Sequence, residues 1–355
     1  MSDYIVVINP GSTSTKVSLF EGEKIVSEEN FRLDAAELTR YDNVADQFDY
    51  RMQPINRWLE ACRVKAGEVK AVVGRGAPLK PLEGGSYEIN DQMLDDIRNR
   101  RYSNHASNLG AIIARHLGER FAAPSLIADP ITVDNFTDLA RVSGFPEIVR
   151  RCRAHTLNIR AVARRIAAGE GKKLEEVNFV VVHMGGGISV AALEGGRVVD
   201  VNDGLLGMGP FSPDRAGALP IGALVKLCYS GKYSEVELVD RLSRKAGLQA
   251  YLGTNDLREV ENMIAGGDEK ALLYFNAMAY QIAKEAGCAA VVLKGNFESI
   301  ILTGGMANSK RLVEEIKKYI SFLGKVVVVP GEFEMEALAT AGMRYLKGEE
   351  ILKKY

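Results

Sequence analysis

The same order of strands and turns occurs twice in this 355-residue chain, with the second copy starting near its middle. Each copy has an apolar strand, a turn rich in glycine, a second strand, a short turn and a third strand. The strands lie at residues 4–8, 17–20 and 24–27 in the first copy and at 179–182, 188–193 and 197–201 in the second. Such self-similarity predicts two related domains instead of one enlarged core.

Each copy is followed by segments whose apolar residues have helical spacing and by further short strands. We expect helices at 44–65, 90–121, 146–168, 221–227, 235–246, 257–265, 269–293 and 310–322, and strands at 71–73, 125–128, 299–302 and 326–329. The order β-β-β-α-β-α thus occurs twice. It predicts an α/β fold with two mixed sheets and a cleft between the two halves.

Charge and cysteine usage exclude several classes of protein. Lys and Arg number 45 against 46 Asp and Glu, a formal net charge of -1, so the chain has no overall field to hold nucleic acid. The four cysteines are far apart and form no zinc motif or disulfide framework, which fits a reducing compartment. No apolar run is long enough to cross a bilayer. We therefore expect a cytoplasmic protein that binds neither nucleic acid nor membrane, and whose anion binding is local.

The first glycine turn joins two strands and is rich in phosphate-binding groups. Gly11 allows close approach of the backbone, while backbone N–H groups and the neighbouring hydroxyls can donate to phosphate oxygens, and Lys16 adds positive charge. The hydroxyls belong to Ser12, Thr13 and Ser14. A Walker P-loop is excluded because a strand follows the turn, where that motif requires a helix. The alternative is a hairpin turn with no ligand.

Two further glycine turns follow strands in the second half. The first has His183 at its start and then Gly185, Gly186 and Gly187, more glycines than a tight hairpin needs. The second joins a strand to a helix and contains Gly304, Gly305, Met306 and Asn308, whose N–H groups are placed to meet a nucleotide. The strand-to-helix turn alone is weak evidence, because many such connections contain two glycines. The three together predict a nucleotide bound between two similar domains.

Three charged residues lie outside helical faces. Arg75 and Arg215 each occur in a segment rich in glycine and proline, so we expect them to contact a ligand; the alternative for each is an exposed arginine. Asp129 follows the strand at 125–128 and precedes a proline, where it can project its carboxylate into a cleft or cap a turn.

Residues 5–16 and 179–196 together resemble the two signature regions of the acetate and butyrate kinase family, within the superfamily of actin, Hsp70 and sugar kinases. The segments 74–85, 105–110, 155–158 and 209–217 resemble the butyrate kinase branch. The resemblance covers essentially the whole chain. It implies two RNase H-like domains of duplicated β-β-β-α-β-α-β-α order around a nucleotide cleft. The first, residues 1–155 plus 336–355, would contact carboxylate and phosphate, and the second, residues 156–335, would bind the nucleotide.

The family resemblance implies a reversible kinase that uses ATP and Mg²⁺ to convert butyrate to butanoyl phosphate, with ADP as the other product, by direct in-line transfer. Branched-chain acids, propionate and acetate remain alternative substrates, and a hydroxyl-directed sugar kinase or an actin-like switch is a more distant alternative. A carboxylate nucleophile is already ionised at pH 7 and needs no general base, so catalysis should depend on positioned cations. The resemblance also implies a homodimer or higher homo-oligomer and a pathway link to a phosphate acyltransferase.

The resemblance also assigns roles to individual residues. Asn9, Ser12, Ser14 and Lys16 would face the phosphates and metal, Arg75 and Arg215 would hold the carboxylate and the transferring phosphoryl group, His183 would contact that group, Asp129 would hold Mg²⁺ with Asn9, and His105 and His155 match further active-site histidines. A metal-associated glutamate near the C-terminus maps less cleanly. Glu332, Glu334 and Glu336 are all candidates, with a slight preference for Glu336.

Overall fold

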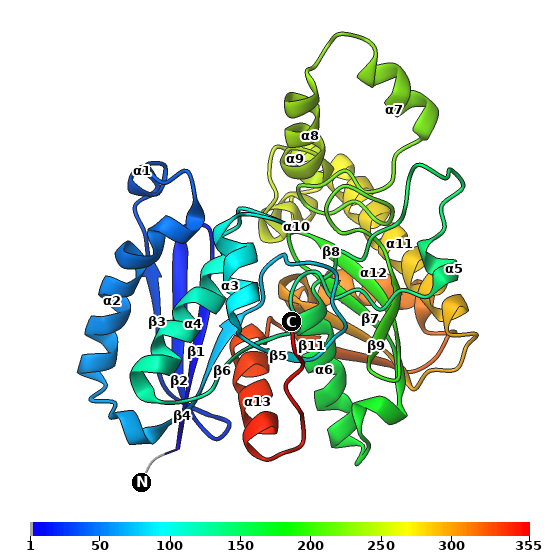
Figure 1. Cartoon of the computed structure of the whole chain (residues 1–355). Coiled ribbons are helices and arrows are strands. Elements are labelled where there is room, and N and C mark those ends of the chain that lie inside the picture. Colours follow the sequence, from blue (N-terminus) through cyan, green and yellow to red (C-terminus); the bar gives the residue numbers. More distant parts are fainter. Residues whose placement is uncertain (1–2) are drawn as a thin grey trace. The chain divides into compact units, whose positions relative to one another are not determined.

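The structure is a computed structural model that describes residues 3–355, and the chain divides into two compact units (Figure 1). Unit 1 comprises the chain up to Asp134 together with Phe333–Tyr355, and unit 2 is Asn135–Glu332. The sequence placed these boundaries at 155/156 and 335/336. The first differs because the segment before residue 155 is tied to unit 2: the Thr137 N–H donates to the Val199 carbonyl.

Unit 1 is built on a six-stranded mixed sheet of order β3-β2-β1-β4-β6-β5. Its strands are β1 (Tyr4–Pro10), β2 (Ser14–Glu21), β3 (Lys24–Arg32), β4 (Val69–Arg75), β5 (Ser86–Glu88) and β6 (Ser125–Ala128). The first three strands are antiparallel, β4 and β6 run parallel to β1, and β5 forms an antiparallel edge. The short edge strand β5 was not predicted.

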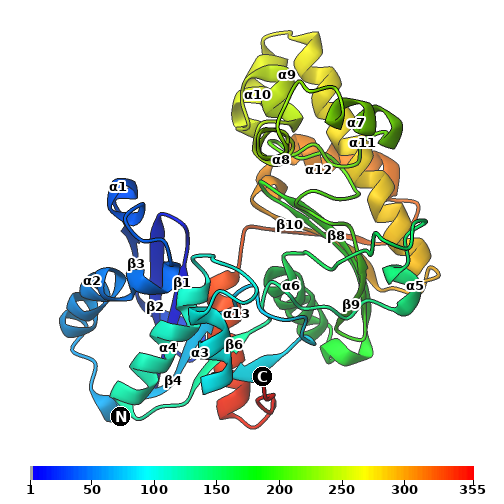
Figure 2. The ribbon, with the colours of Figure 1, turned by 45° about the horizontal axis from the view of Figure 1, so that its top comes forward.

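Helices cover both faces of this sheet (Figure 2). The helical elements are α1 (Ala35–Leu38), η1 (Val44–Gln47), α2 (Phe48–Ala61), η2 (Ala66–Glu68), α3 (Asp91–Arg98), α4 (Asn108–Phe121) and α13 (Glu334–Leu346). The helices α2, α3 and α4 form one core with Val6 and Ile8 of β1. The C-terminal helix α13 packs on the other face, where a Cβ on Gly342 would lie 2.9 Å from the Val73 side chain.

Unit 2 contains a five-stranded sheet of order β11-β10-β7-β8-β9. Its strands are β7 (Asn178–Met184), β8 (Ile188–Glu194), β9 (Arg197–Val201), β10 (Ser299–Gly304) and β11 (Val326–Pro330). The pairings β7–β8 and β8–β9 are antiparallel, while β10 is parallel to both β7 and β11. The order and directions of β9-β8-β7-β10-β11 match those of β3-β2-β1-β4-β6, so the internal repeat and the α/β class predicted from the sequence are confirmed.

The helices of unit 2 also cover both faces of its sheet. They are α5 (Asp138–Arg141), α6 (Thr156–Gly169), η3 (Leu174–Glu176), α7 (Ile221–Cys228), α8 (Glu235–Arg244), α9 (Gly247–Leu252), α10 (Leu257–Ala265), α11 (Glu269–Val292), η4 (Gly305–Asn308) and α12 (Lys310–Ile320). The long helix α11 packs with α12 against Val180 and Val182, and α6 contacts β7 and β10. Across residues 3–355, no helix has the length and apolarity needed to span a membrane.

Two of the predicted helices are wrong in extent. The segment 90–121 forms two helices because α3 ends at Arg98 and Arg100 adopts a left-handed φ of 54°, so the chain turns before α4 begins. The segment 146–168 is helical only from Thr156. Before it, Arg150 is bonded to the Ala140 carbonyl at 2.7 Å and paired with Asp200 of β9 at 2.7 Å, which holds that stretch as a loop.

Candidate active site

Three site residues predicted from the sequence lie at the carboxyl ends of neighbouring strands in the unit 1 sheet. Asn9 is near the end of β1, Arg75 ends β4, and Asp129 follows β6. These strands are parallel and in register, with Ile8 opposite Gly74 and Arg75 opposite Ala128. Ligands of open α/β sheets bind outside the carboxyl ends of parallel strands, so this topology places all three residues where a ligand is expected.

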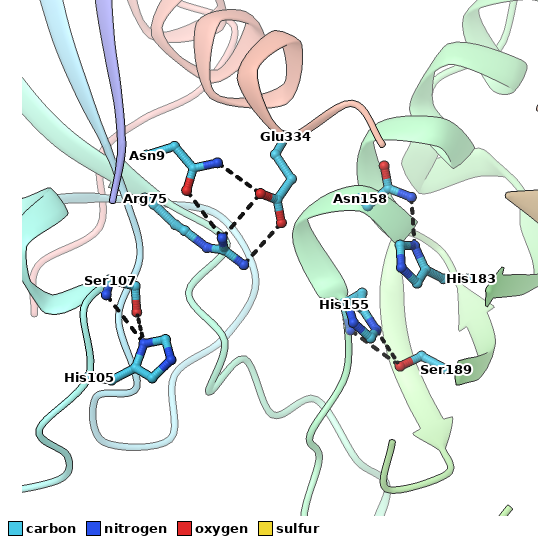
Figure 3. Close-up of polar contacts among 9 residues, drawn as sticks. All are labelled: Asn9, Arg75, His105, Ser107, His155, Asn158, His183, Ser189 and Glu334. Carbon is cyan, nitrogen blue, oxygen red and sulfur yellow. Dashed lines mark hydrogen bonds and ion pairs between the residues drawn. The ribbon is translucent and has the colours of Figure 1, made fainter. Parts of the chain in front are cut away.

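Arg75 is held by a carboxylate from α13 (Figure 3). Its Nη2 lies 3.0 Å from Glu334 Oε1, and its Nη1 donates to Glu334 Oε2 and to Asn9 Oδ1, each at 3.1 Å. The Asn9 amide nitrogen donates to Glu334 Oε2 at 2.8 Å and closes the cluster. Two contacts to one carboxylate fix the plane of the guanidinium as well as its position.

The glutamate beside Asn9 and Arg75 is therefore Glu334. Glu336, which the sequence favoured, is exposed. Residues two positions apart on a helix point about 200° apart, so only one of the two can face the sheet edge. Glu332 lies in unit 2.

His105 and Asp129 each accept a hydrogen bond from a backbone N–H group. The Ser107 backbone N–H donates to His105 Nδ1 at 3.2 Å, so this nitrogen is an acceptor and the proton lies on Nε2. Burial, and then the charge of Arg75, lower the pKa of His105. Asp129 is 6% exposed, has a left-handed φ of 38°, and accepts from the Gly85 N–H at 2.8 Å through Oδ1. Such backbone conformations cost free energy and are concentrated at functional sites.

Ser14, at the end of the first glycine turn, and Lys16 project on the same face of the sheet as Asn9. Asn9 is paired with Lys16 across β1 and β2, so their side chains project to one side of the sheet, together with Ser14 two residues earlier. Lys16 Nζ forms an ion pair of 2.7 Å with Glu28 of β3. Ser12 and Thr13, at the tip of the turn, are exposed.

In unit 2, two histidines stack between β7 and the start of α6 (Figure 3). The ring centroids of His155 and His183 are 4.0 Å apart with an interplanar angle of 17°. His155 Nδ1 lies 2.9 Å from Ser189 Oγ, and Ser189 is paired with His183 across β7 and β8. The amide nitrogen of Asn158 lies 2.9 Å from His183 Nδ1.

These contacts define the protonation state of His183. The Asn158 amide donates, so Nδ1 is the acceptor and the single proton lies on Nε2. Burial, and then His155, hold the pKa of His183 well below its usual range, so the ring is neutral at pH 7. Its Nε2 faces the glycine turn, 3.4 Å from where a Cβ on Gly185 would lie. The site therefore offers a neutral, directed N–H donor.

Arg215 lies against the same glycine turn. Its Nη1 donates to the Gly204 carbonyl, and its Nε lies 3.8 Å from Asp214 Oδ1. The Ser212 hydroxyl accepts from the Arg215 backbone N–H at 3.2 Å and donates to the Gly186 carbonyl. A Cβ on Gly187 would collide with the guanidinium, so this glycine makes room for Arg215.

A pocket of about 800 Å³ opens within unit 2, a size typical of small-molecule sites. It is lined by Gly185, Gly186, Pro213, Asp214, Asn255, Asp256, Leu257, Arg258, Glu261, Gly305, Met306, Asn308, Ser309 and Glu332. The glycines at 185, 186 and 305 thus line it with Met306 and Asn308. Gly187 and Gly304 do not; Gly304 has a φ of 91° and its Cβ would clash with the Met184 backbone.

The wall formed by residues 255–261 was missed by sequence reasoning. Asp256 caps α10 by accepting from the Arg258 N–H and also pairs with the Arg258 guanidinium. The available signal was the capping pattern before α10, which predicts a helix start and nothing about a ligand.

The residues of this chain fit a hard divalent cation bound with a nucleotide. Within residues 3–355, no group of three or more His, Cys, Asp or Glu side chains is arranged to hold a metal. Mg²⁺ in phosphoryl-transfer sites uses one or two carboxylates, with phosphate and water oxygens as its other ligands. Asp129, Glu334 and the amide oxygen of Asn9 supply suitable oxygen atoms in unit 1.

Comparison with known proteins agrees with these observations. The model of the acetokinase family matches residues 145–329. The chain is 48% identical over 351 residues to "Probable butyrate kinase 2" of Caldanaerobacter subterraneus subsp. tengcongensis, covering 99% of each chain.

Solved structures show the same fold at low sequence identity. An acetate kinase from Porphyromonas gingivalis has a TM-score of 0.78 and 20% identity over 97% of this chain and all of its own. A propionate kinase from Francisella tularensis has a TM-score of 0.75 and 18% identity over 95% of this chain and 98% of its own. The chain belongs to the acetate and butyrate kinase family, the acetokinase family.

Proposed function

We propose that this protein transfers the γ-phosphoryl group of ATP to butyrate, or to a related short or branched carboxylate, to form the acyl phosphate and ADP. The full-length similarity to a probable butyrate kinase carries this proposal. The site geometry supports it, because both units present fixed polar donors for anions and the reaction needs no general base.

The nucleotide would occupy the pocket of unit 2, where glycine backbone at residues 185, 186 and 305 allows close approach. His183 would donate its Nε2–H to an oxygen of the transferring phosphoryl group. A neutral donor suits this task, because it can stabilise the charge that develops on the phosphoryl oxygens and has no paired anion of its own to displace first. Arg215, held at the same turn by Gly204 and Asp214, would supply positive charge.

Unit 1 would position the acceptor. Arg75, oriented by Glu334 and Asn9, would bind the substrate carboxylate, and the turn at 11–14 would donate to phosphate oxygens. One carboxylate oxygen would attack phosphorus in line while the bond to the β–γ bridging oxygen breaks, so ADP leaves and no proton moves. Mg²⁺, when bound through oxygen atoms of Asp129, Asn9 or Glu334, would neutralise phosphate charge.

The metabolic setting is part of the same proposal. Membership of the acetokinase family supports a cytoplasmic enzyme that forms a homo-oligomer. It also supports a pathway link in which a phosphate acyltransferase supplies or consumes the acyl phosphate.

The test is hydroxylamine trapping with ATP, Mg²⁺ and a series of C2–C5 acids. We expect a hydroxamate, with kcat/KM highest for butyrate or a branched C4–C5 acid. Each methylene changes selectivity by about 1–3 kcal/mol, so the series resolves neighbouring acids. Absence of hydroxamate with every acid, together with phosphorylation of an alcohol or sugar, would reject the proposal. A clear preference for acetate would reject the choice of substrate only.

A further inference from the structure

A fully buried arginine lies beneath the first glycine turn. Arg51, on the first turns of α2, has a relative exposure of 0%. Its guanidinium makes six hydrogen bonds, and all of them go to neutral oxygens. The acceptors are the carbonyls of Gly11, Ser12 and Ser14 at 2.9, 3.2 and 3.0 Å, the Thr15 hydroxyl at 3.0 Å, and the Gln47 side-chain oxygen at 3.1 and 2.8 Å.

These contacts determine which way the turn faces. Arg51 takes up three of the four carbonyls of residues 11–14, and the Leu33 N–H takes up the fourth, that of Thr13, at 2.9 Å. Within residues 3–355, by contrast, no hydrogen bond uses the N–H groups of Ser12 and Thr13 or the hydroxyls of Ser12, Thr13 and Ser14. The acceptors of the turn therefore point inward, while the N–H groups of Ser12 and Thr13 and the three hydroxyls are left for a ligand, which is the arrangement that binds anions.

Arg51 also differs from Lys16 and Arg75, because its guanidinium is bonded to neutral oxygens and their charged groups are paired with carboxylates. Lys16 is paired with Glu28, and Arg75 with Glu334, so both of those cations are neutralised. Burial lowers the pKa of Arg51 to about 10, and the group is still a cation at pH 7. A positive charge balanced only by dipoles, in a region that water screens poorly, adds attraction for an anion at the turn.

We infer that Arg51 is a positioning residue for the nucleotide phosphates: it holds the turn at residues 11–14 with its donors outward and supplies the unneutralised positive charge behind them. This inference rests on the proposed function, because it assumes that ATP phosphates reach this turn. Both the planar fork and the charge are needed, since lysine offers one ammonium in place of a fork that reaches several carbonyls.

The test compares ATP with adenosine, which lacks the phosphates. We expect Arg51→Met to weaken ATP binding about 10- to 100-fold and to lower kcat, while the Kd of adenosine changes less than twofold. Arg51→Lys should give an intermediate loss for ATP. Arg57→Met is the matched control, because Arg57 is an exposed arginine of the same helix, and it should leave both affinities unchanged.

Each outcome decides the question. ATP affinity at the wild-type level in a folded Arg51→Met protein would overturn the inference, as would an equal loss for adenosine, which would show a general structural role. If Arg51→Met does not fold by circular dichroism, Arg51→Lys decides: a loss of at least fivefold confined to ATP supports the inference, and any smaller loss, or an equal loss for adenosine, overturns it. Failure of the proposed function is recognised separately, because then the wild-type protein itself forms no hydroxamate.

Discussion

The contact between Gly187 and Arg215 gives a sharp test of how the second half of the site is held. In Gly187→Ala, the added Cβ would overlap Arg215 Nη1 and lie 3.1 Å from both its Cζ and the Gly204 carbonyl. The φ of Gly187 is not left-handed, so the backbone tolerates alanine and the strain falls on the arginine. Overpacking costs about 1–3 kcal/mol, and the guanidinium can escape by moving.

A displaced guanidinium should cost activity more than stability. Loss of one positioned charge partner raises a transition-state barrier by about 2.7–4 kcal/mol, which corresponds to roughly 100- to 1000-fold in rate. We therefore expect Gly187→Ala to lower kcat/KM about 100-fold in the hydroxamate assay. Gly222→Ala is the comparison outside the site, because Gly222 is exposed, lines no pocket described above and a Cβ there meets nothing within 4 Å, so its loss should be at least tenfold smaller.

A double-mutant cycle separates this explanation from a general defect. If Gly187→Ala acts through Arg215, it should cause less than about a threefold further loss in an Arg215→Ala background, because the residue that it displaces is already gone. Equal losses in both backgrounds would refute the reasoning. So would a Gly187→Ala protein that is no less active than Gly222→Ala.

Three other predictions follow from the contacts described above. Glu334→Gln should lower kcat/KM about 10- to 100-fold by releasing Arg75, while Glu336→Gln should stay within about twofold; equal losses, or a larger loss in Glu336→Gln, would contradict the role assigned to Glu334. Because the pKa of His183 is lowered, the unfolded chain binds a proton that the folded chain does not, so the free energy of unfolding should fall below about pH 6.5, by at most about 1.4 kcal/mol per pH unit. Urea titrations should show this fall, with a shallower slope in His183→Gln; identical slopes would contradict it. Gly342→Ala should lower the free energy of unfolding by about 1–3 kcal/mol, because its Cβ would press on Val73; an unchanged urea midpoint would contradict that close packing.

Much of the fold could be predicted, because the repeat and the strands are visible as short apolar runs followed by turns rich in glycine. The apolar runs at 4–8 and 179–182 and the turns after them identify both sheets, and the structure confirms their shared strand order. The residues at which helices begin and end were harder to predict. The break between α3 and α4 depends on a left-handed residue, Arg100, which apolar spacing does not signal.

The candidate site could be predicted as individual residues but not as contacts. Asn9 and Arg75 stand out in sequence, yet their joint partner depends on the rotational phase of α13, so Glu334 could not be told from Glu336. Arg51 was missed for a similar reason. An arginine in an amphipathic helix predicts a solvent-facing position, and only tertiary packing places this one beneath the turn.

In both units, a side chain at the start of a helix holds a polar residue near the end of the central strand. Asn9 and His183 hold corresponding positions near the ends of the central strands β1 and β7, and each is held by a side chain from the first turn of a helix, Glu334 of α13 and Asn158 of α6. Glu334 is a carboxylate that accepts a hydrogen bond, and Asn158 is an amide that donates one. The two units thus share one strand order, and the side chain in the first turn of the supporting helix sets the difference between them. A glutamate there gives unit 1 a charged group beside the strand end, and an asparagine there gives unit 2 an uncharged one. Each support also depends on helical register, because a shift of one residue rotates a side chain by about 100° and would remove it.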